Sequence, residues 1–105
     1  MNTAPQEMAL VPSDFDPPLD PGIASAVIIL RQANIETYES CEGGDGHAYP
    51  YPAIRFHGGQ PEGFRALAIA LYHDLPISSL RRVWSIQDRE PTGPTWELEF
   101  YRKIG

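Results

Sequence analysis

Near its C-terminus the chain reads Thr95-Trp96-Glu97-Leu98-Glu99-Phe100-Tyr101-Arg102, in which large apolar and polar side chains alternate. Successive side chains of a β-strand point to opposite faces of its sheet. The period of two therefore predicts a strand with Trp96, Leu98 and Phe100 facing a core and Glu97, Glu99 and Tyr101 facing away. A sheet with one apolar and one polar face is covered by helices on one side only, which predicts the α+β class.

Two helices are predicted from apolar residues that recur at intervals of three and four. The first begins at Asp20-Pro21, because aspartate accepts from free N–H groups and proline suits the first helical position, and it ends at Asn34. The second begins at Pro61 and ends at Leu75-Pro76. The predicted apolar faces are Ile23, Val27, Leu30 and Ala33 on the first helix, and Phe64, Leu67, Ala68 and Leu71 on the second.

Three further strands are predicted at residues 35–40, 53–57 and 80–89, which are rich in β-branched and aromatic residues. Residues 90–94, Glu-Pro-Thr-Gly-Pro, are expected to form the loop before the last strand. The resulting order is αββαββ. We predict one α+β domain over residues 21–105, with a four-stranded, mainly antiparallel sheet and both helices packed on one face. The two halves share this layout, which suggests an internal repeat.

Residues 1–20 predict a flexible, proline-rich and acidic arm, since they hold four prolines, four acidic residues and no basic one. In the alternative, the apolar residues of the arm pack on the domain or on a neighbouring subunit; these are Met8, Leu10, Val11 and Phe15. The arm carries most of the net charge of −6, so the domain itself is nearly neutral. A basic surface for phosphate groups is missing, which argues against a nucleic-acid partner.

The sequence indicates a cytoplasmic protein. The longest apolar run, residues 23–30, is too short to span a bilayer, and no leader peptide is recognisable. The single cysteine is typical of a reducing compartment.

The reactive side chains gather in Ser40-Cys41-Glu42-Gly43-Gly44-Asp45-Gly46-His47 and in the strand that follows, which contains Arg55 and His57. Cys41, His47, Arg55 and His57 are the candidate ligand-binding residues, and Cys41 with His47 is the candidate catalytic pair. The acidic neighbours of Cys41 disfavour a thiolate, and cysteine is among the most frequently buried residues. We therefore favour a structural thiol over a nucleophile.

A metal ion would take Cys41, His47 and His57, with Asp45 or His73 as a fourth ligand. The paired spacings typical of structural zinc are missing, so we favour a solvated loop and predict no metal and no cofactor. The glycines match neither a phosphate loop nor a dinucleotide fingerprint, and the acids among them would repel phosphate. Tight turns explain these glycines.

The predicted polar face of the sheet holds Arg55, His57, Glu97, Glu99 and Tyr101. This face is either solvated or an interface, because tyrosine and arginine are enriched where proteins meet. Arg81-Arg82 is expected to be balanced by Glu97 or Glu99 across strands.

The run Thr37-x-x-Ser40-Cys41-x-Gly43, the later Gly46-His47 and the strand Ile54-Arg55-Phe56 resemble short uncharacterised proteins encoded by bacteria and their phages. The likeness covers about residues 24–60 and extends weakly through the second helix to Trp96. It implies a compact cytoplasmic α+β domain and carries over no catalytic residue, since no activity is established for that group.

From these features we predict a small non-catalytic binding or accessory module that acts through a sheet face or through the Cys/Gly/His loop. Its partner would be another protein or a second copy of the chain, with neither nucleic acid nor membrane involved. The alternative is a small enzyme or a ligand or metal site centred on Cys41 and His47.

Overall fold

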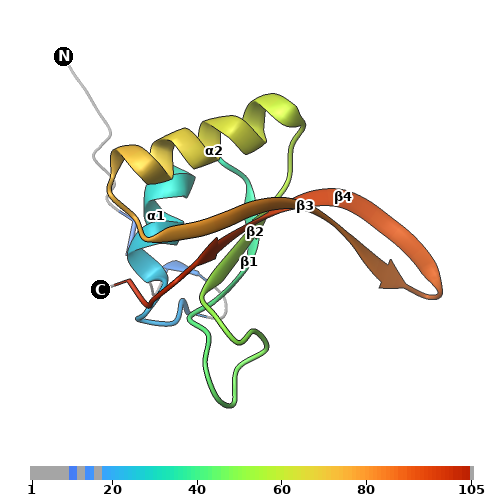
Figure 1. Ribbon diagram of the computed structural model, residues 1–105, viewed down its shortest axis with the longest axis horizontal. Coiled ribbons are helices and arrows are strands. Elements are labelled where there is room, and N and C mark those ends of the chain that lie inside the picture. Colours follow the sequence, from blue (N-terminus) through green and yellow to red (C-terminus); the bar gives the residue numbers. More distant parts are fainter. Residues whose placement is uncertain (1–9, 12–13, 16–17, 105) are drawn as a thin grey trace.

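The computed structural model of the protein describes residues 10–11, 14–15 and 18–104. Along the chain it contains α1 (Ala24–Gln32), β1 (Thr37–Cys41), β2 (Ala53–Phe56), α2 (Gln60–Tyr72), β3 (Ile77–Gln87) and β4 (Glu90–Phe100) (Figure 1). The predicted αββαββ order is confirmed. The strands form one sheet in the order β1-β2-β4-β3, and all neighbouring strands are antiparallel. In the described part of the chain, neither helix has the length and apolar character needed to cross a membrane.

The core lies between the sheet and the two helices, which cover the same face (Figure 1). The alternation predicted for the last strand is confirmed: Trp96, Leu98 and Phe100 are buried, and the first two lie opposite Phe56 and Ile54 of β2. The helices contribute the rest of the core, chiefly Ile23, Ala26, Val27 and Leu30 from the α1 segment and Ala66 and Ala70 from α2.

The first helix begins at Ala24, later than Asp20-Pro21, so the predicted start is wrong. Residues 21–23 form a turn in which the Asp20 carbonyl accepts from the N–H groups of Ile23 and Ala24 at 3.1 and 3.0 Å. The Asp20 carboxylate does not cap this helix. It accepts the N–H of Glu42 at 3.3 Å and so ties the helix entrance to the loop after β1.

Part of the predicted arm packs on the domain. Phe15 and Leu19 lie against the core, and the guanidinium of Arg31 sits over the Phe15 ring at 5.5 Å. The alternative that Phe15 packs on its own domain is therefore observed, while Val11 is exposed and Met8 lies outside the described residues.

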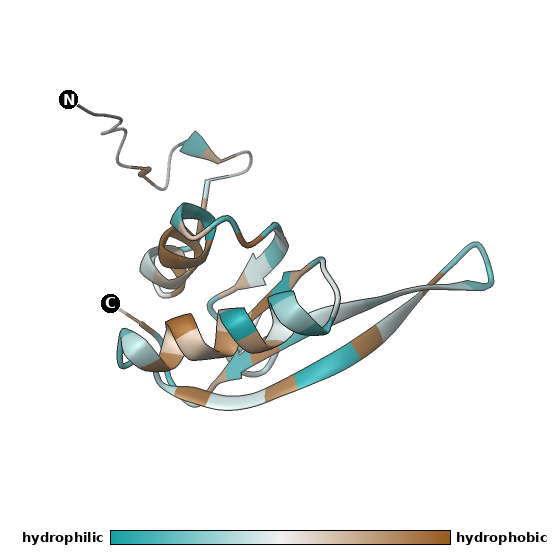
Figure 2. Ribbon diagram, turned by 90° about the horizontal axis from the view of Figure 1, so that it is seen from above, coloured by the Kyte–Doolittle hydropathy of each residue, from teal (hydrophilic) through white to brown (hydrophobic). Residues whose placement is uncertain are grey.

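Residues 90–94 are strand and not loop, so that prediction is wrong as well. β3 turns directly into β4 through Asp88 and Arg89, whose φ angles of 50° and 68° suit a two-residue hairpin turn. β2 pairs only with residues 96–99 of β4. Within the described residues, residues 90–94 are therefore bordered by β3 alone, and prolines are tolerated at such an edge. The far half of the hairpin consequently extends beyond the sheet (Figures 1 and 2).

The predicted helix over α2 is confirmed, but of its predicted apolar row only Leu67 packs against the core. Phe64 and Leu71 are 59% and 56% exposed, while Gly63, Ala66 and Ala70 are buried. The cause is Trp96, whose indole lies against Gly63 and donates to the carbonyls of Gly58 and Gly59 at 3.0 Å each. Only small residues fit between the α2 axis and this ring, so Phe64 and Leu71 point outward, whereas Leu67 and Ile69 are partly buried against the core.

Replacing Gly63 by alanine tests this close approach. The added Cβ would overlap the buried indole of Trp96, and the overlap should outweigh the helix propensity that alanine gains. We expect Gly63→Ala to lower the free energy of unfolding by about 1–2 kcal/mol in denaturant titrations. Gly59→Ala is the matched control, since its Cβ would meet its nearest neighbour at 3.6 Å, and it should stay within about 1 kcal/mol of wild type. Equal stability of Gly63→Ala and wild type would contradict the packing argument.

Candidate functional site

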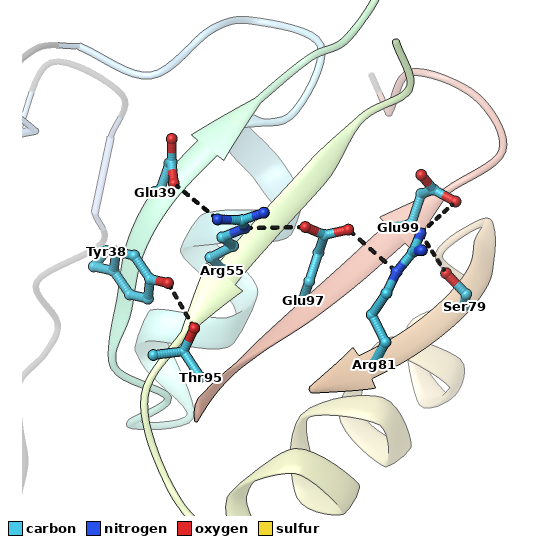
Figure 3. A network of polar contacts seen from close by, with 8 residues as sticks. All are labelled: Tyr38, Glu39, Arg55, Ser79, Arg81, Thr95, Glu97 and Glu99. Atoms are coloured by element: carbon cyan, nitrogen blue, oxygen red, sulfur yellow. Dashed lines mark hydrogen bonds and ion pairs between the residues drawn. The ribbon is translucent and has the colours of Figure 1, made fainter. Parts of the chain in front are cut away.

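A row of alternating charges crosses the sheet face opposite the helices (Figure 3). Glu39 of β1, Arg55 of β2, Glu97 of β4 and Arg81 of β3 lie directly opposite one another in the strand registers. The Nε–H of Arg55 donates to Glu97 Oε1 at 3.0 Å, and Nε of Arg81 lies 3.3 Å from Glu97 Oε2. The expectation that the Arg81-Arg82 pair is balanced across strands is confirmed for Arg81.

Glu97 is the centre of this charge row, with only 6% of its surface exposed. Burial by itself lowers the pKa of Arg55, but the hydrogen bond to Glu97 and nearby Tyr49, Glu97 and Glu39 raise it overall. The Tyr49 ring lies 5.3 Å from the Arg55 guanidinium, and burial together with a hydrogen bond to Glu39 raises the pKa of the phenol. Glu97 is thus paired on both sides, as a buried charge requires. We read the charge row as a structural network.

The second group of reactive side chains lies where β1 ends. Cys41 is 6% exposed, and its sulfur accepts the N–H of Gly43 at 3.4 Å. The carboxylate of Asp20, the Cys41 sulfur and a ring nitrogen of His47 all lie within 4.8 Å of one another. The Nδ1 atom of His47 is 3.8 Å from Asp20 Oδ2. We call Asp20, Cys41 and His47 the thiol cluster.

Glu42 contacts the thiol cluster through His47. Its Oε2 lies 3.4 Å from Nε2 of His47 and 3.5 Å from Nζ of Lys103, and its Oε1 accepts the N–H of Gly22 at 2.8 Å. The hydrogen bond from Gly22, with smaller contributions from Lys103 and His47, holds the pKa of Glu42 below its ordinary value despite some burial. Glu42 is therefore a carboxylate fixed in place beside the imidazole.

The glycines bring His47 back toward β1. Gly43 has a φ of 80°, and a Cβ there would overlap the backbone of Tyr51 and Pro52, so no other residue fits. The N–H of His47 donates to the Gly44 carbonyl at 3.1 Å, which closes the turn. The loop returns the imidazole to the strand end that carries Cys41.

The structure thus brings Cys41 and His47 together and places the other two candidate residues elsewhere. Arg55 belongs to the charge row. His57 stacks on Tyr38 with ring centroids 4.4 Å apart. Cys41 lies opposite Ala53, and His57, the residue after β2, is four positions further along the chain. It is therefore about 13 Å away along the strand direction. The proposed fourth ligands also lie outside the thiol cluster: Asp45 is exposed on the loop, and His73 is the C-cap residue of α2.

Asp20 and Glu42 are the members that sequence reasoning missed. Asp20 lies twenty-one residues before Cys41, and only the packing of α1 on β1 brings the two together. Glu42 is adjacent to Cys41, but in the sequence its negative charge counts against a thiolate at Cys41 and against a bound phosphate. No short-range spacing signals this arrangement.

Comparison with known proteins identifies no relative. No protein-family model, no curated protein sequence and no solved structure matches the chain. The resemblance to phage-encoded and bacterial proteins therefore stays a prediction, and the function has to be inferred from the geometry.

Replacing Glu97 by glutamine tests the charge row. The variant leaves Arg55 and Arg81 facing a neutral amide at the centre of a buried network. We expect the free energy of unfolding to fall by about 1–3 kcal/mol, less than for fully buried pairs because Arg81 is half exposed. Glu39→Gln is the control, since this carboxylate is exposed and 4.0 Å from Arg55, and it should change stability by less than about 0.5 kcal/mol. Similar losses in the two variants, measured by urea unfolding, would refute the central role of Glu97.

Proposed function

We propose that this protein is a non-catalytic binding module that pairs with a second copy of itself through α2 and the edge strand β3. The observation that carries the proposal is the outward orientation of the large apolar residues of α2. A helix that is apolar on two sides is typically buried on both. Here the fully buried positions of α2 hold only small residues, and the exposed Phe64 and Leu71 are left for a partner.

Exposed apolar side chains concentrate on these two elements. Among the described residues nine large hydrophobic side chains are exposed, and five of them belong to α2 or β3. Three of the five are aromatic, and aromatic residues are enriched at protein interfaces and supply much of their binding energy. The five are Phe64, Leu71, Tyr72, Trp84 and Ile86.

The apolar row of α2 lies on the flank that faces away from α1. On the flank toward α1, Arg65 donates to the Ala33 carbonyl, and Ile69 and His73 border α1 residues. Residues 64, 67 and 71 are three and four apart and lie on the other side of the helix. α2 runs above β3 and packs against it (Figure 1). We call Phe64 and Leu71, with the partly buried Leu67 between them, the outer flank of α2.

β3 offers a matching backbone edge. It is the last strand of the sheet, and within the described residues only β4 pairs with it. Edge strands are commonly protected by charged residues, but Arg81 is held by Glu97 and Glu99, and Arg82 lies over the Trp96 ring at 4.4 Å. Two copies related by a two-fold axis can add β3 to β3 and continue the sheet. The outer flanks of both α2 helices would then meet on the same face.

The thiol cluster supports a non-catalytic role. Cys41 is buried, its sulfur already accepts a backbone N–H, and the candidate residues Arg55 and His57 lie apart from it. A nucleophilic cysteine requires access for its substrate and a base within hydrogen-bond reach. The burial of Cys41 leaves little access for a substrate, and its sulfur contacts a backbone N–H and not a base.

The dimer is tested with Leu71→Glu, which places a charge on the outer flank of α2. Leu71 is more than half exposed in a single copy, so the monomer fold should tolerate the change, as far-UV circular dichroism can verify. We expect wild type to run as a dimer in light scattering and sedimentation velocity, and Leu71→Glu to weaken the dimer at least about 10-fold because its interface would bury two charges.

Tyr101→Glu is the matched control, because Tyr101 is equally exposed but lies outside α2 and β3. It should leave the dimer intact. A wild-type protein that stays monomeric at millimolar concentration would rule the proposal out. Equal dimerisation of wild type and Leu71→Glu would do the same for the surface assigned here.

A further inference from the structure

We propose that the thiol cluster binds a divalent transition-metal ion of the zinc class, with Asp20, Cys41 and His47 as ligands. The three donors come from the helix entrance, the end of β1 and the glycine loop, and their ligand atoms lie within 4.8 Å of one another. This set differs from the one expected from the sequence, since Asp20 takes the place of His57. The proposal rests on other residues than the dimer and is independent of it.

The donor types select the metal. A thiolate, an imidazole and a carboxylate together suit zinc, whereas calcium and magnesium prefer oxygen ligands alone. In a tetrahedral zinc site with bonds of 2.0–2.3 Å, ligand atoms are separated by about 3.3–3.8 Å. Nδ1 of His47 and Oδ2 of Asp20 lie close to this range at 3.8 Å. The 4.8 Å limit on the whole cluster leaves a small inward movement for the third ligand, and water would fill the fourth position.

The surroundings of the thiol cluster suit a ligand set. A histidine that binds a metal through one nitrogen usually donates the other N–H to a carboxylate. Nδ1 of His47 faces Asp20, and Nε2 faces Glu42 at 3.4 Å. Glu42 is fixed by the Gly22 N–H, so it can orient the ring in this manner.

The other two ligands are supported by backbone N–H groups. The N–H of Gly43 donates to the Cys41 sulfur and orients it. The N–H of Glu42 donates to Oδ2 of Asp20 and directs this carboxylate toward the thiol cluster. Each of the three ligands therefore has an orienting partner.

The same contacts have a simpler explanation in which His47 only pairs with Asp20 and Glu42, and Cys41 is a buried structural thiol. In that case the Cys41 sulfur would not ligate a metal, and an ion would bind no better than to any surface histidine. Sulfur ligation separates the two explanations. The experiment is therefore built on a metal whose spectrum reports a thiolate ligand.

The full chain, purified with a chelator and then freed of it, is titrated with Co²⁺ and followed by optical absorption. We expect one ion per chain, a thiolate-to-cobalt charge-transfer band, and loss of that band when Zn²⁺ is added. Cys41→Ser should abolish the band, and Asp20→Asn and His47→Ala should weaken binding at least about 10-fold. His57→Ala and His73→Ala are matched controls that remove a histidine outside the thiol cluster and should bind as wild type does.

Cys41 is buried, so Cys41→Ser could lose its fold, and X-ray absorption of zinc-loaded wild type provides a second measurement without a variant. One sulfur ligand on zinc supports the proposal. Ligation by nitrogen and oxygen alone overturns it, as does a cobalt spectrum with no charge-transfer band. Equal loss of binding in His57→Ala and His47→Ala would also overturn it, because the ion would then be shared among surface histidines.

Discussion

The buried charge of Glu97 is the constraint on which the register of the sheet depends. A carboxylate at this depth has to be paired, and the arginines on the two neighbouring strands, Arg55 and Arg81, lie directly opposite it. A slip of one residue between β2 and β4 would set Arg55 against Trp96 or Leu98 and turn the apolar side chains of β4 away from the helices. The charge row and the core therefore specify the same register from opposite faces of the sheet.

Because the charge row satisfies its own charges, the polar face presents few groups to a ligand. The sequence left open whether this face is solvated or an interaction surface. The interaction sites that we propose lie at its borders instead. At the border near β1, the glycine loop brings His47 onto Cys41, and at the other border β3 leaves its backbone edge beside the outer flank of α2. Both proposed activities thus lie where the sheet stops, and neither uses Arg55.

The sequence could predict the features that depend on neighbouring residues. The alternation of residues 96–100 and the balance of Arg81 by acids across the strand follow from the strand period alone. The hairpin could not be placed, because Pro91 and Pro94 are typical of a loop. They are tolerated in β4 because β2 does not pair with this part of the strand. The actual turn at Asp88-Arg89 requires positive φ angles at residues that carry no glycine signal.

The side of α2 that meets the sheet could not be predicted from the sequence either, because it depends on a contact between distant residues. A helical period gives the angles between side chains but not which sector meets the sheet, and here the contact of Trp96 with Gly63 decides. Once the ring occupies that space, Phe64 and Leu71 have to face outward. The surface that we assign to the second copy is therefore a direct consequence of how the core is filled. A bulkier residue at position 63 would disturb the core and the interface together, because both are set by the same close approach.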